Sequence, residues 1–228
     1  MAESGLAAVL FDLDGTLADT APDMARTVNL MRDRRGLAPV PDSQVRPHVS
    51  SGARGMICSA FGMRTDHPDY ATMRAEFLDL YVDNLCIATR LFPGMEALLD
   101  AIEASGLKWG VVTNKFERMA RLVMAGLGLS ERAGVIVGGD TCPRAKPFPD
   151  PLLHAAAVLG VEPARTLYIG DDERDVQAAR AAGMPVIVAG YGYLGEERAP
   201  SLWGADAIMQ SVAEIDAWVR NQSAERAA

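Results

Sequence analysis

The sequence has few cysteines, only three lysines, and no apolar segment long enough to span a bilayer. Cys58, Cys86 and Cys142 are odd in number and widely spaced, and no Cys-x-x-Cys pair is present. This pattern argues against a disulfide framework and against a zinc site, so we interpret them as reduced thiols. The first residues lack the pattern of a signal peptide. These absences favour a cytoplasmic protein without a membrane partner.

Positive side chains are also fewer than negative ones. The sequence has 22 Lys and Arg and 30 Asp and Glu, which gives a net charge of −8 and a pI of about 4.9. That balance argues against nucleic acid as a partner. An anionic substrate remains compatible if a cation and nearby Lys or Arg reverse the field at its site. The 228 residues, 49% of them hydrophobic, fit one domain or one domain with an insertion, as a monomer or a homodimer.

A short apolar run from Ala7 to Phe11 is typical of a buried strand. It ends in Asp12 and Asp14, which leave the strand end on one side because side chains alternate along a strand. Two close carboxylates repel each other, and a cation between them would remove the conflict. Gly15 allows the backbone to turn tightly. We therefore expect a site for a metal and a phosphate here, although an ordinary acidic turn is the alternative.

Beyond Pro93 apolar strands alternate with helices, which predicts an α/β fold with a doubly wound parallel sheet. The predicted strands are 109–112, 134–138, 166–169, 185–189 and 206–209, and the predicted helices are 95–104, 117–125, 151–159, 175–182 and 212–220, with a frayed tail from Asn221 to Ala228. Ligands of such sheets bind beyond the carboxyl ends of the strands.

The segment between the first strand and Lys108 has helical periodicity and no evident strand. Thr20 is the predicted N-cap of its first helix, with Asp23 at the third position, and that helix runs to about Arg34. Further helices are expected at 56–61 and 70–85. We interpret residues 20–86 as an α-helical cap domain inserted into an α/β core made of residues 1–19 and 87–228.

Two further segments carry polar groups at strand ends or in loops. Thr113 and Asn114 close a predicted strand, and a hydroxyl and an amide there suit phosphate oxygens. Pro147 excludes helical geometry at Lys146, whose ammonium could neutralise Asp12 and a phosphate together. A strand-to-helix cap and a solvated loop lysine are the respective alternatives.

A fourth segment places four acids within five residues, at positions 171, 172, 173 and 175. Asp171 follows an apolar strand, and Asp175 lies one helical turn further on the same side. The acids would repel each other unless a cation or solvent relieves them. A solvated acidic helix start is the alternative, since carboxylates favour helix N-termini. The role of Asp172 stays open.

Taken in order, the four segments resemble the four motifs of the haloacid dehalogenase (HAD) superfamily, beginning with Asp-x-Asp-Gly-Thr after the first strand. The resemblance implies a Rossmann-like core and hydrolysis of a phosphomonoester through an aspartyl-phosphate, with Asp12 as nucleophile and Asp14 as general acid/base. It also implies Mg²⁺ held by Asp12, the carbonyl of Asp14 and Asp171, with Asp175 in support. The phosphoryl group would be bound by Thr113, Asn114 and Lys146.

Asp14 indicates phosphoryl chemistry, because dehalogenases of the superfamily lack its equivalent. Over nearly its full length the sequence is similar to bacterial phosphoglycolate phosphatases, a group in carbohydrate metabolism. The segments that carry this similarity are Thr20-Ala21-Pro22-Asp23, Leu91-Phe92-Pro93-Gly94, Val111-Val112-Thr113-Asn114-Lys115 and Tyr168-Ile169-Gly170-Asp171-Asp172-Glu173-Arg174-Asp175. A small phosphorylated metabolite of the phosphoglycolate type is therefore the expected substrate.

Features in the predicted cap, together with two segments of the predicted core, are instead similar to a subgroup that hydrolyses N-acetylmuramic acid 6-phosphate in cell-wall recycling, and this substrate is the main alternative. Those features are Ser51-Gly52-Ala53-Arg54, Tyr191-Gly192-Tyr193 and Trp203-Gly204-Ala205-Asp206. Both substrates carry a carboxylate, which Arg54 could bind bidentately; an exposed arginine at a helix start is the other interpretation. A sugar phosphomutase and a non-catalytic binding module are further alternatives.

Overall fold

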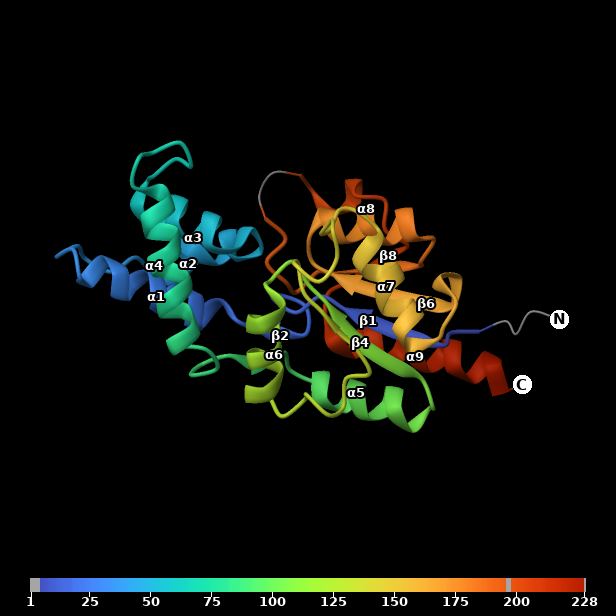
Figure 1. Ribbon diagram of the computed structural model, residues 1–228. Coiled ribbons are helices and arrows are strands. Elements are labelled where there is room, and N and C mark those ends of the chain that lie inside the picture. Colours follow the sequence, from blue (N-terminus) through green and yellow to red (C-terminus); the bar gives the residue numbers. More distant parts are fainter. Residues whose placement is uncertain (1–4, 196–197, 228) are drawn as a thin grey trace.

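The computed structural model describes residues 5–195 and 198–227 and shows an α/β sheet domain with a group of helices beside it (Figure 1). The described residues form a six-stranded parallel sheet with the order β5-β4-β1-β6-β7-β8. Its strands are β1 (Ala8–Phe11), β4 (Lys108–Val112), β5 (Ile136–Val137), β6 (Thr166–Gly170), β7 (Val186–Ala189) and β8 (Ala207–Met209). The predicted doubly wound sheet is confirmed, and the strand ends differ from prediction by at most two residues.

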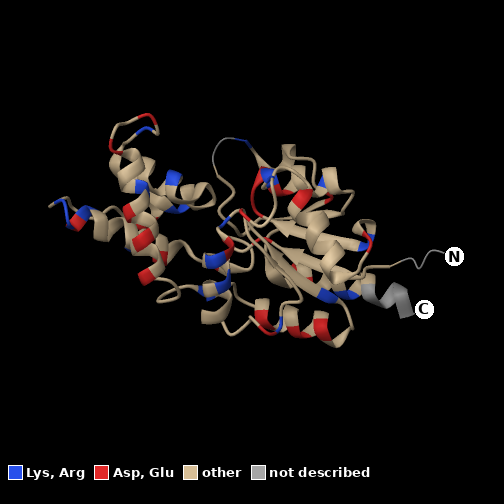
Figure 2. Cartoon of the chain, viewed as in Figure 1, with Lys and Arg blue, Asp and Glu red and all other residues tan. Residues whose placement is uncertain are grey.

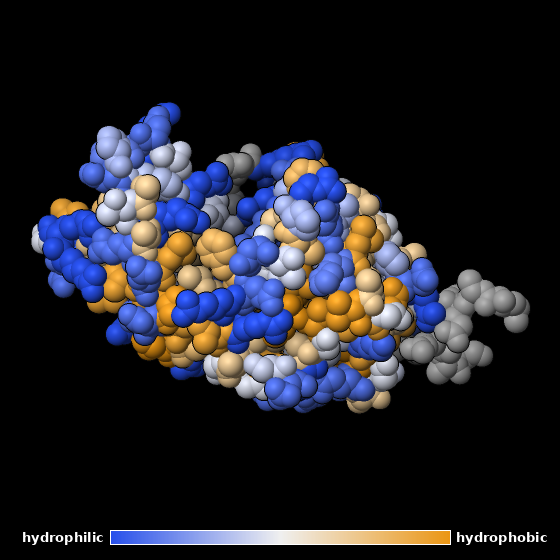
Figure 3. All heavy atoms as spheres, viewed as in Figure 1, coloured by the Kyte–Doolittle hydropathy of each residue, from blue (hydrophilic) through white to orange (hydrophobic). Residues whose placement is uncertain are grey.

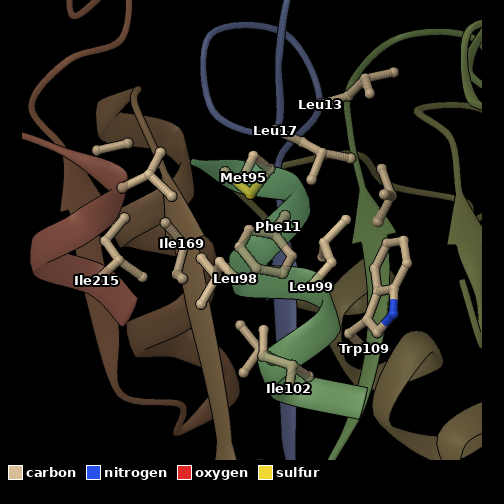
Figure 4. Packing of buried hydrophobic residues seen from close by; sticks show 14 of the residues in the cluster. Phe11, Leu13, Leu17, Met95, Leu98, Leu99, Ile102, Trp109, Ile169 and Ile215 are labelled. Atoms are coloured by element: carbon tan, nitrogen blue, oxygen red, sulfur yellow. The ribbon is translucent and has the colours of Figure 1, made fainter. Parts of the chain in front are cut away.

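Two hydrophobic cores cover the two faces of this sheet, because alternate residues of each strand point to opposite sides. Val9 and Phe11 of β1 belong to one core, and Ala8 and Leu10 belong to the other. Figure 4 shows Phe11 in the first core, where its ring meets the edge of Trp109 at 6.4 Å between centroids. The first core contains α5 (Met95–Ala104), α6 (Glu117–Gly126) and α9 (Val212–Ala227), and the second contains α7 (Asp150–Leu159) and α8 (Glu173–Ala182).

The remaining helices lie together beside the sheet domain and bury a core of their own, which includes Met31, Met56 and Phe77 (Figure 1). We call this group the helical insertion. It consists of α1 (Ala21–Asp33), α2 (Asp42–Val45), α3 (Gly52–Phe61) and α4 (Tyr70–Asp83), with a 3-10 helix at Arg46–Ser51. Each buries one apolar face against the others, as amphipathic helices do.

The prediction that no strand lies between Asp14 and Lys108 is wrong. Strands β2 (Ala18–Asp19) and β3 (Arg90–Leu91) pair antiparallel where the chain enters and leaves the helical insertion. Two-residue strands are too short to show a period of two, so the sequence contains no signal for them. This small ribbon joins the two connections to the insertion.

Thr20 is the N-cap residue of α1, as predicted, but its side chain makes no capping hydrogen bond to the helix. The Thr20 hydroxyl donates to Asp14 Oδ1 at 2.5 Å instead. The carboxylate of Asp23 accepts hydrogen bonds from the N–H and hydroxyl of Thr89 at 3.0 and 2.6 Å. The Tyr193 hydroxyl accepts from the N–H of Thr20 at 2.9 Å. Side chains that suit a local cap are thus used for contacts with distant segments.

Other predictions concern the ends and the surface of the chain. The three cysteines are free, as predicted. The last helix continues to Ala227, so the predicted fraying is wrong as far as that residue, and Ala228 lies outside the described residues. Within residues 5–195 and 198–227, no helix has both the length and the apolar character needed to cross a bilayer. Hydrophobic atoms reach the surface among hydrophilic ones in Figure 3, which is usual for proteins and by itself indicates no partner.

Candidate active site

Three carboxylates meet beyond the carboxyl end of the sheet. Asp12 follows β1 and Asp171 follows β6, and the parallel pairing of these strands brings their ends side by side. Asp175 lies in the first turn of α8. One oxygen of each carboxylate lies within 4.8 Å of the corresponding oxygens of the other two. The structure therefore brings two of the four predicted segments together as a single acidic group.

Burial and mutual repulsion disfavour the charged form of these acids. Burial raises the pKa of Asp12 to about 6, Lys146 opposes this effect, and Asp175 and Asp14 add to it. Burial, with Asp12 and Asp175 nearby, also raises the pKa of Asp171 well above its usual value. A divalent cation would remove both penalties, so the group has the electrostatic character of a metal site.

The hydrogen bonds of the carboxylates distinguish two ligands from a supporting residue. Oδ2 of Asp12 accepts no hydrogen bond within the described part of the chain, and each oxygen of Asp171 accepts one, from the Thr16 hydroxyl at 2.9 Å and the Tyr193 N–H at 2.8 Å. Because a carboxylate oxygen has two lone pairs, these two side chains retain capacity for a metal. Asp175 accepts three bonds, two on Oδ1 from Lys146 and the Tyr168 hydroxyl and one on Oδ2 from the Asp172 N–H, so it retains the least capacity of the three. Asp12 and Asp171 thus fit a hard cation directly, and Asp175 fits as their support.

Gly15 is required by this arrangement. Its φ is +89°, and a Cβ at this position would lie 2.1 Å from Asp171 Oδ2. An L side chain would therefore be strained and would displace the carboxylate.

Lys146 is buried and fixed beside the acids. Its ammonium donates to Asp175 Oδ1 at 2.6 Å, to the Tyr168 hydroxyl at 2.8 Å and to the Val112 carbonyl at 2.9 Å. It also lies 3.1 Å from Asp12 Oδ1. Burial alone would lower the pKa of Lys146, but Asp12 and Asp175 outweigh it and raise the pKa above its usual value. This permanent positive charge faces any anion that approaches Asp12.

The second predicted segment contributes in two different ways. Both polar atoms of the Asn114 side chain bind the backbone of Lys146: Oδ1 accepts from its N–H at 3.0 Å and Nδ2 donates to its carbonyl at 2.9 Å. Asn114 therefore positions Lys146. Thr113 is buried, and its hydroxyl oxygen accepts from the Lys115 N–H at 3.2 Å. The hydroxyl proton of Thr113 remains available to a phosphate oxygen.

Asp14 stands apart from the three-carboxylate group. Its oxygens lie 2.6 and 2.9 Å from the ammonium of Lys115. The ring of Tyr81, in α4, also lies beside that ammonium, with its centroid 4.9 Å from Nζ. Lys115 is not among the predicted site residues. The available signal was a rare residue type directly after Thr113 and Asn114, in a chain with three lysines.

Asp172 links the sheet domain to the insertion. It caps α8 and accepts from the Arg174 guanidinium at 2.7 and 2.8 Å, and Arg174 in turn donates to the carbonyl of Ser50 at 2.7 Å. Burial opposes ionisation of Asp172, but Arg174 outweighs it and holds the pKa below its usual value. Asp172 therefore stays charged and anchors Arg174.

A cavity of about 350 Å³ separates the helical insertion from these residues. Figure 2 shows acidic and basic segments meeting at this junction. Arg54 lines the cavity from the insertion, is exposed, and has no hydrogen-bond or ion-pair partner within the described ranges. The polar lining comes from Asp12, Asp14, Ser50, Ser51, Arg54, Arg74, Tyr81, Thr113, Asn114, Lys115, Lys146, Asp172, Arg174 and Asp175, and the apolar lining includes Met24, Val49, Phe77, Leu78, Phe116 and Met119.

The known proteins that are similar to this chain in sequence and in fold include proteins named as phosphatases. The chain is 47% identical over 210 residues to N-acetylmuramic acid 6-phosphate phosphatase of Pseudomonas aeruginosa, with 92% of this chain and 93% of that protein covered. It is 46% identical over 211 residues to phosphoglycolate phosphatase of Xanthomonas campestris pv. campestris, with 91% and 94% covered.

Among solved structures, the crystal structure of a predicted phosphoglycolate phosphatase from Haemophilus somnus 129PT is similar, with a TM-score of 0.80 and 27% identity over 92% of this chain and 96% of that one. The family model for haloacid dehalogenase-like hydrolases matches residues 9–189, from the first strand of the sheet to the end of β7. The chain belongs to the haloacid dehalogenase-like hydrolase family.

Proposed function

We propose that the protein is a Mg²⁺-dependent phosphomonoester hydrolase that works through an aspartyl-phosphate on Asp12. The observation that carries this proposal is the environment of one atom. Asp12 lines the cavity, and its Oδ2 accepts no hydrogen bond from the described residues. Its other oxygen, Oδ1, lies 3.1 Å from the buried ammonium of Lys146. A nucleophile needs such an unoccupied oxygen beside a fixed positive charge.

The metal would be held by Asp12, Asp171 and the backbone carbonyl of Asp14, with Asp175 outside this set. When bound, Mg²⁺ would offset the negative charge of the carboxylates and of the phosphate. Thr16 and Tyr193 orient Asp171 for this role, since they hold one oxygen each. The hydroxyl of Thr113 and the ammonium of Lys146 would donate to the phosphoryl oxygens, and Asn114 would keep Lys146 in place.

The reaction has two steps. In the first, Asp12 attacks phosphorus, the bond from phosphorus to the ester oxygen breaks, and Asp14 gives that oxygen its proton. In the second, Asp14 takes a proton from water, the water oxygen attacks phosphorus, and the bond to Asp12 breaks, which restores the carboxylate of Asp12 and the protonated Asp14 and releases phosphate. The side chain of Asp14 is paired with Lys115 in this structure, so it would have to turn away from Lys115 to reach the reacting oxygen.

We propose a small phosphorylated metabolite that carries a carboxylate as the substrate, with 2-phosphoglycolate as the first candidate and Arg54 as the carboxylate-binding residue. A specific observation favours N-acetylmuramic acid 6-phosphate as the second candidate. The cavity of about 350 Å³ equals the liquid volume of about twelve water molecules, which is more than a two-carbon ester fills. Its apolar lining, which includes Phe77 and Met119, suits a sugar ring better than a glycolate.

We further propose that residues 20–86 act as a cap that closes over this cavity and excludes water during the reaction. The enzyme would act in the cytoplasm, as a monomer or a homodimer, with no nucleic acid or membrane as a partner.

The test is phosphate release with Mg²⁺ from 2-phosphoglycolate, N-acetylmuramic acid 6-phosphate, glucose 6-phosphate and p-nitrophenyl phosphate. We expect one of the two carboxylate substrates to have the highest kcat/KM, and Asp12→Asn to abolish turnover of all four. Activity that survives Asp12→Asn would refute the nucleophile assignment. Absence of hydrolysis on every substrate would favour a binding module, and isomerisation of the hexose phosphate would favour a phosphomutase.

A further inference from the structure

We propose that Lys115 and Tyr81 form a binding site for a second anionic group of the substrate, and that an anion bound there releases Asp14 for proton transfer. This inference rests on the proposed phosphatase function and concerns the cavity next to the reacting carboxylates. It assigns roles to one residue of the sheet domain and one of the helical insertion, both of which line that cavity.

The ammonium of Lys115 is held in a nearly closed environment. Its side chain is 7% exposed, and its Nζ lies 2.6 and 2.9 Å from the two oxygens of Asp14. Burial would lower the pKa of Lys115, but Asp14 and the neighbouring Tyr81 together outweigh burial and raise it, so the group stays charged. A buried ammonium that faces a substrate cavity is a binding element for an anion.

Tyr81 supplies the second observation. The residue is 2% exposed, and its hydroxyl makes no hydrogen bond within residues 5–195 and 198–227. Burial raises the pKa of this hydroxyl to about 12, so it stays protonated and can donate. Buried hydroxyls nearly always have a partner, and one that lacks it at a cavity wall indicates a partner supplied by a ligand. The partner must be an acceptor, since Lys115 already provides the positive charge beside it.

A carboxylate satisfies both groups at once, because one of its oxygens can accept from Lys115 and the other from Tyr81. Each oxygen has a second lone pair, so Arg54, which lines the same cavity, can donate to the same carboxylate. It would compete with Asp14 for the ammonium, and its own charge would repel the carboxylate of Asp14. Asp14 is also held by the Thr20 hydroxyl, at the entrance to the insertion. Once Lys115 is engaged elsewhere, the carboxylate of Asp14 keeps one hydrogen bond among the described residues, from the Thr20 hydroxyl, and becomes free to turn toward the ester oxygen. Substrates without a second anion would leave Asp14 paired with Lys115, so they should be turned over slowly as well as bound weakly.

The experiment uses two pairs of substrates. 2-Phosphoglycolate and ethyl phosphate differ only in the carboxylate, and N-acetylmuramic acid 6-phosphate differs from N-acetylglucosamine 6-phosphate in the lactyl ether that carries the carboxylate. The variants are Lys115→Met, Lys115→Arg and Tyr81→Phe. Lys108→Met, at the opposite end of β4, is the control. Tyr81→Phe removes only the unpartnered oxygen and should fold normally.

In the wild-type protein we expect the carboxylate member of at least one pair to be preferred at least tenfold in kcat/KM, with part of the preference in kcat. Lys115→Met and Tyr81→Phe should each reduce this preference at least threefold, Lys115→Arg should retain more of it than Lys115→Met, and Lys108→Met should leave it unchanged. Equal losses on both members of a pair would indicate a purely structural role and overturn the proposal, as would a wild-type protein without any preference.

Binding measured on the Asp12→Asn protein separates this inference from the proposed function. Calorimetry with 2-phosphoglycolate and ethyl phosphate needs no turnover. Tighter binding of 2-phosphoglycolate that is lost on adding Tyr81→Phe supports the site even if the wild-type protein hydrolyses none of these esters. Equal affinity for the two ligands overturns it.

Discussion

Asp12→Asn should stabilise the metal-free protein at neutral pH while it abolishes activity. The pKa of Asp12 rises from 3.8 to about 6 on folding. At about 1.36 kcal/mol per pKa unit, ionisation of this one buried carboxylate reduces the free energy of unfolding by about 3 kcal/mol at pH 7.5. An amide of the same shape carries no charge, keeps an oxygen for the Leu13 N–H and Lys146, and places its NH₂ on the side where Asp12 accepts no bond.

The sign of the pH dependence follows from the direction of the shift. Because the folded protein holds this proton more tightly than the unfolded chain, the contribution of Asp12 to stability is complete below pH 4. It is lost as the pH rises from about 4 to about 6. The advantage of Asp12→Asn should therefore be about 3 kcal/mol at pH 7.5 and about 1 kcal/mol at pH 4.5.

Urea denaturation in EDTA at these two pH values measures this difference. Asp79→Asn, which neutralises an exposed carboxylate of α4, is the control and should show no such gain. Addition of Mg²⁺ should raise the stability of the wild-type protein more than that of Asp12→Asn, since the metal relieves the same repulsion. The reasoning is refuted if Asp12→Asn is less stable than the wild-type protein at pH 7.5, or if its advantage is equal at both pH values.

Lys146→Met should reduce kcat by about a hundredfold or more. It should also lower the free energy of unfolding by about 3–5 kcal/mol, because two buried carboxylates lose their counterion. An unchanged stability in urea would contradict this prediction. Gly15→Ala should abolish the rise in Tm that Mg²⁺ produces, because the new Cβ would lie 2.1 Å from Asp171 Oδ2. Gly36→Ala, at a similar positive φ with open space around it, is the control and should keep that rise. Arg54→Ala should raise KM for the preferred carboxylate substrate about tenfold and leave Tm unchanged, since Arg54 is exposed; an unchanged KM would remove Arg54 from the site.

The sheet and its acidic edge could be predicted because both leave local signals. Buried parallel strands are continuous apolar runs, so their ends are marked by the first polar residues that follow. Asp12, Thr113 and Asp171 are such residues. Once the parallel sheet is assumed, their positions at one edge follow from topology alone. The structure places Asp12 and Asp171 together for this reason, with β1 and β6 adjacent in the sheet.

The contacts between the sheet domain and the helical insertion could not be predicted in this way. Asp23 has the position of a capping residue, yet its carboxylate binds Thr89, 66 residues further along the chain. Tyr193 binds Asp171 through its N–H and the start of α1 through its hydroxyl. Lys115, which follows β4, and Tyr81 of α4 meet at the cavity between the sheet domain and the helical insertion. Periodicity and local motifs carry no information about such pairs, since each partner has an ordinary local interpretation.

The small number of lysines in the sequence has a consequence for the charge of this site. Two of the three lysines, Lys115 and Lys146, are buried there, and each is paired with a carboxylate. Asp14 and the three-carboxylate group would carry four negative charges if fully ionised, against two from these lysines. The protein alone therefore repels a phosphate, or takes up protons as the raised pKa of Asp12 indicates. One divalent cation would neutralise the two remaining negative charges of these carboxylates. A further positive side chain, such as Arg54, would then be available to attract the substrate. An acidic chain can in this way bind a dianionic ester, provided that the metal and the substrate are bound together.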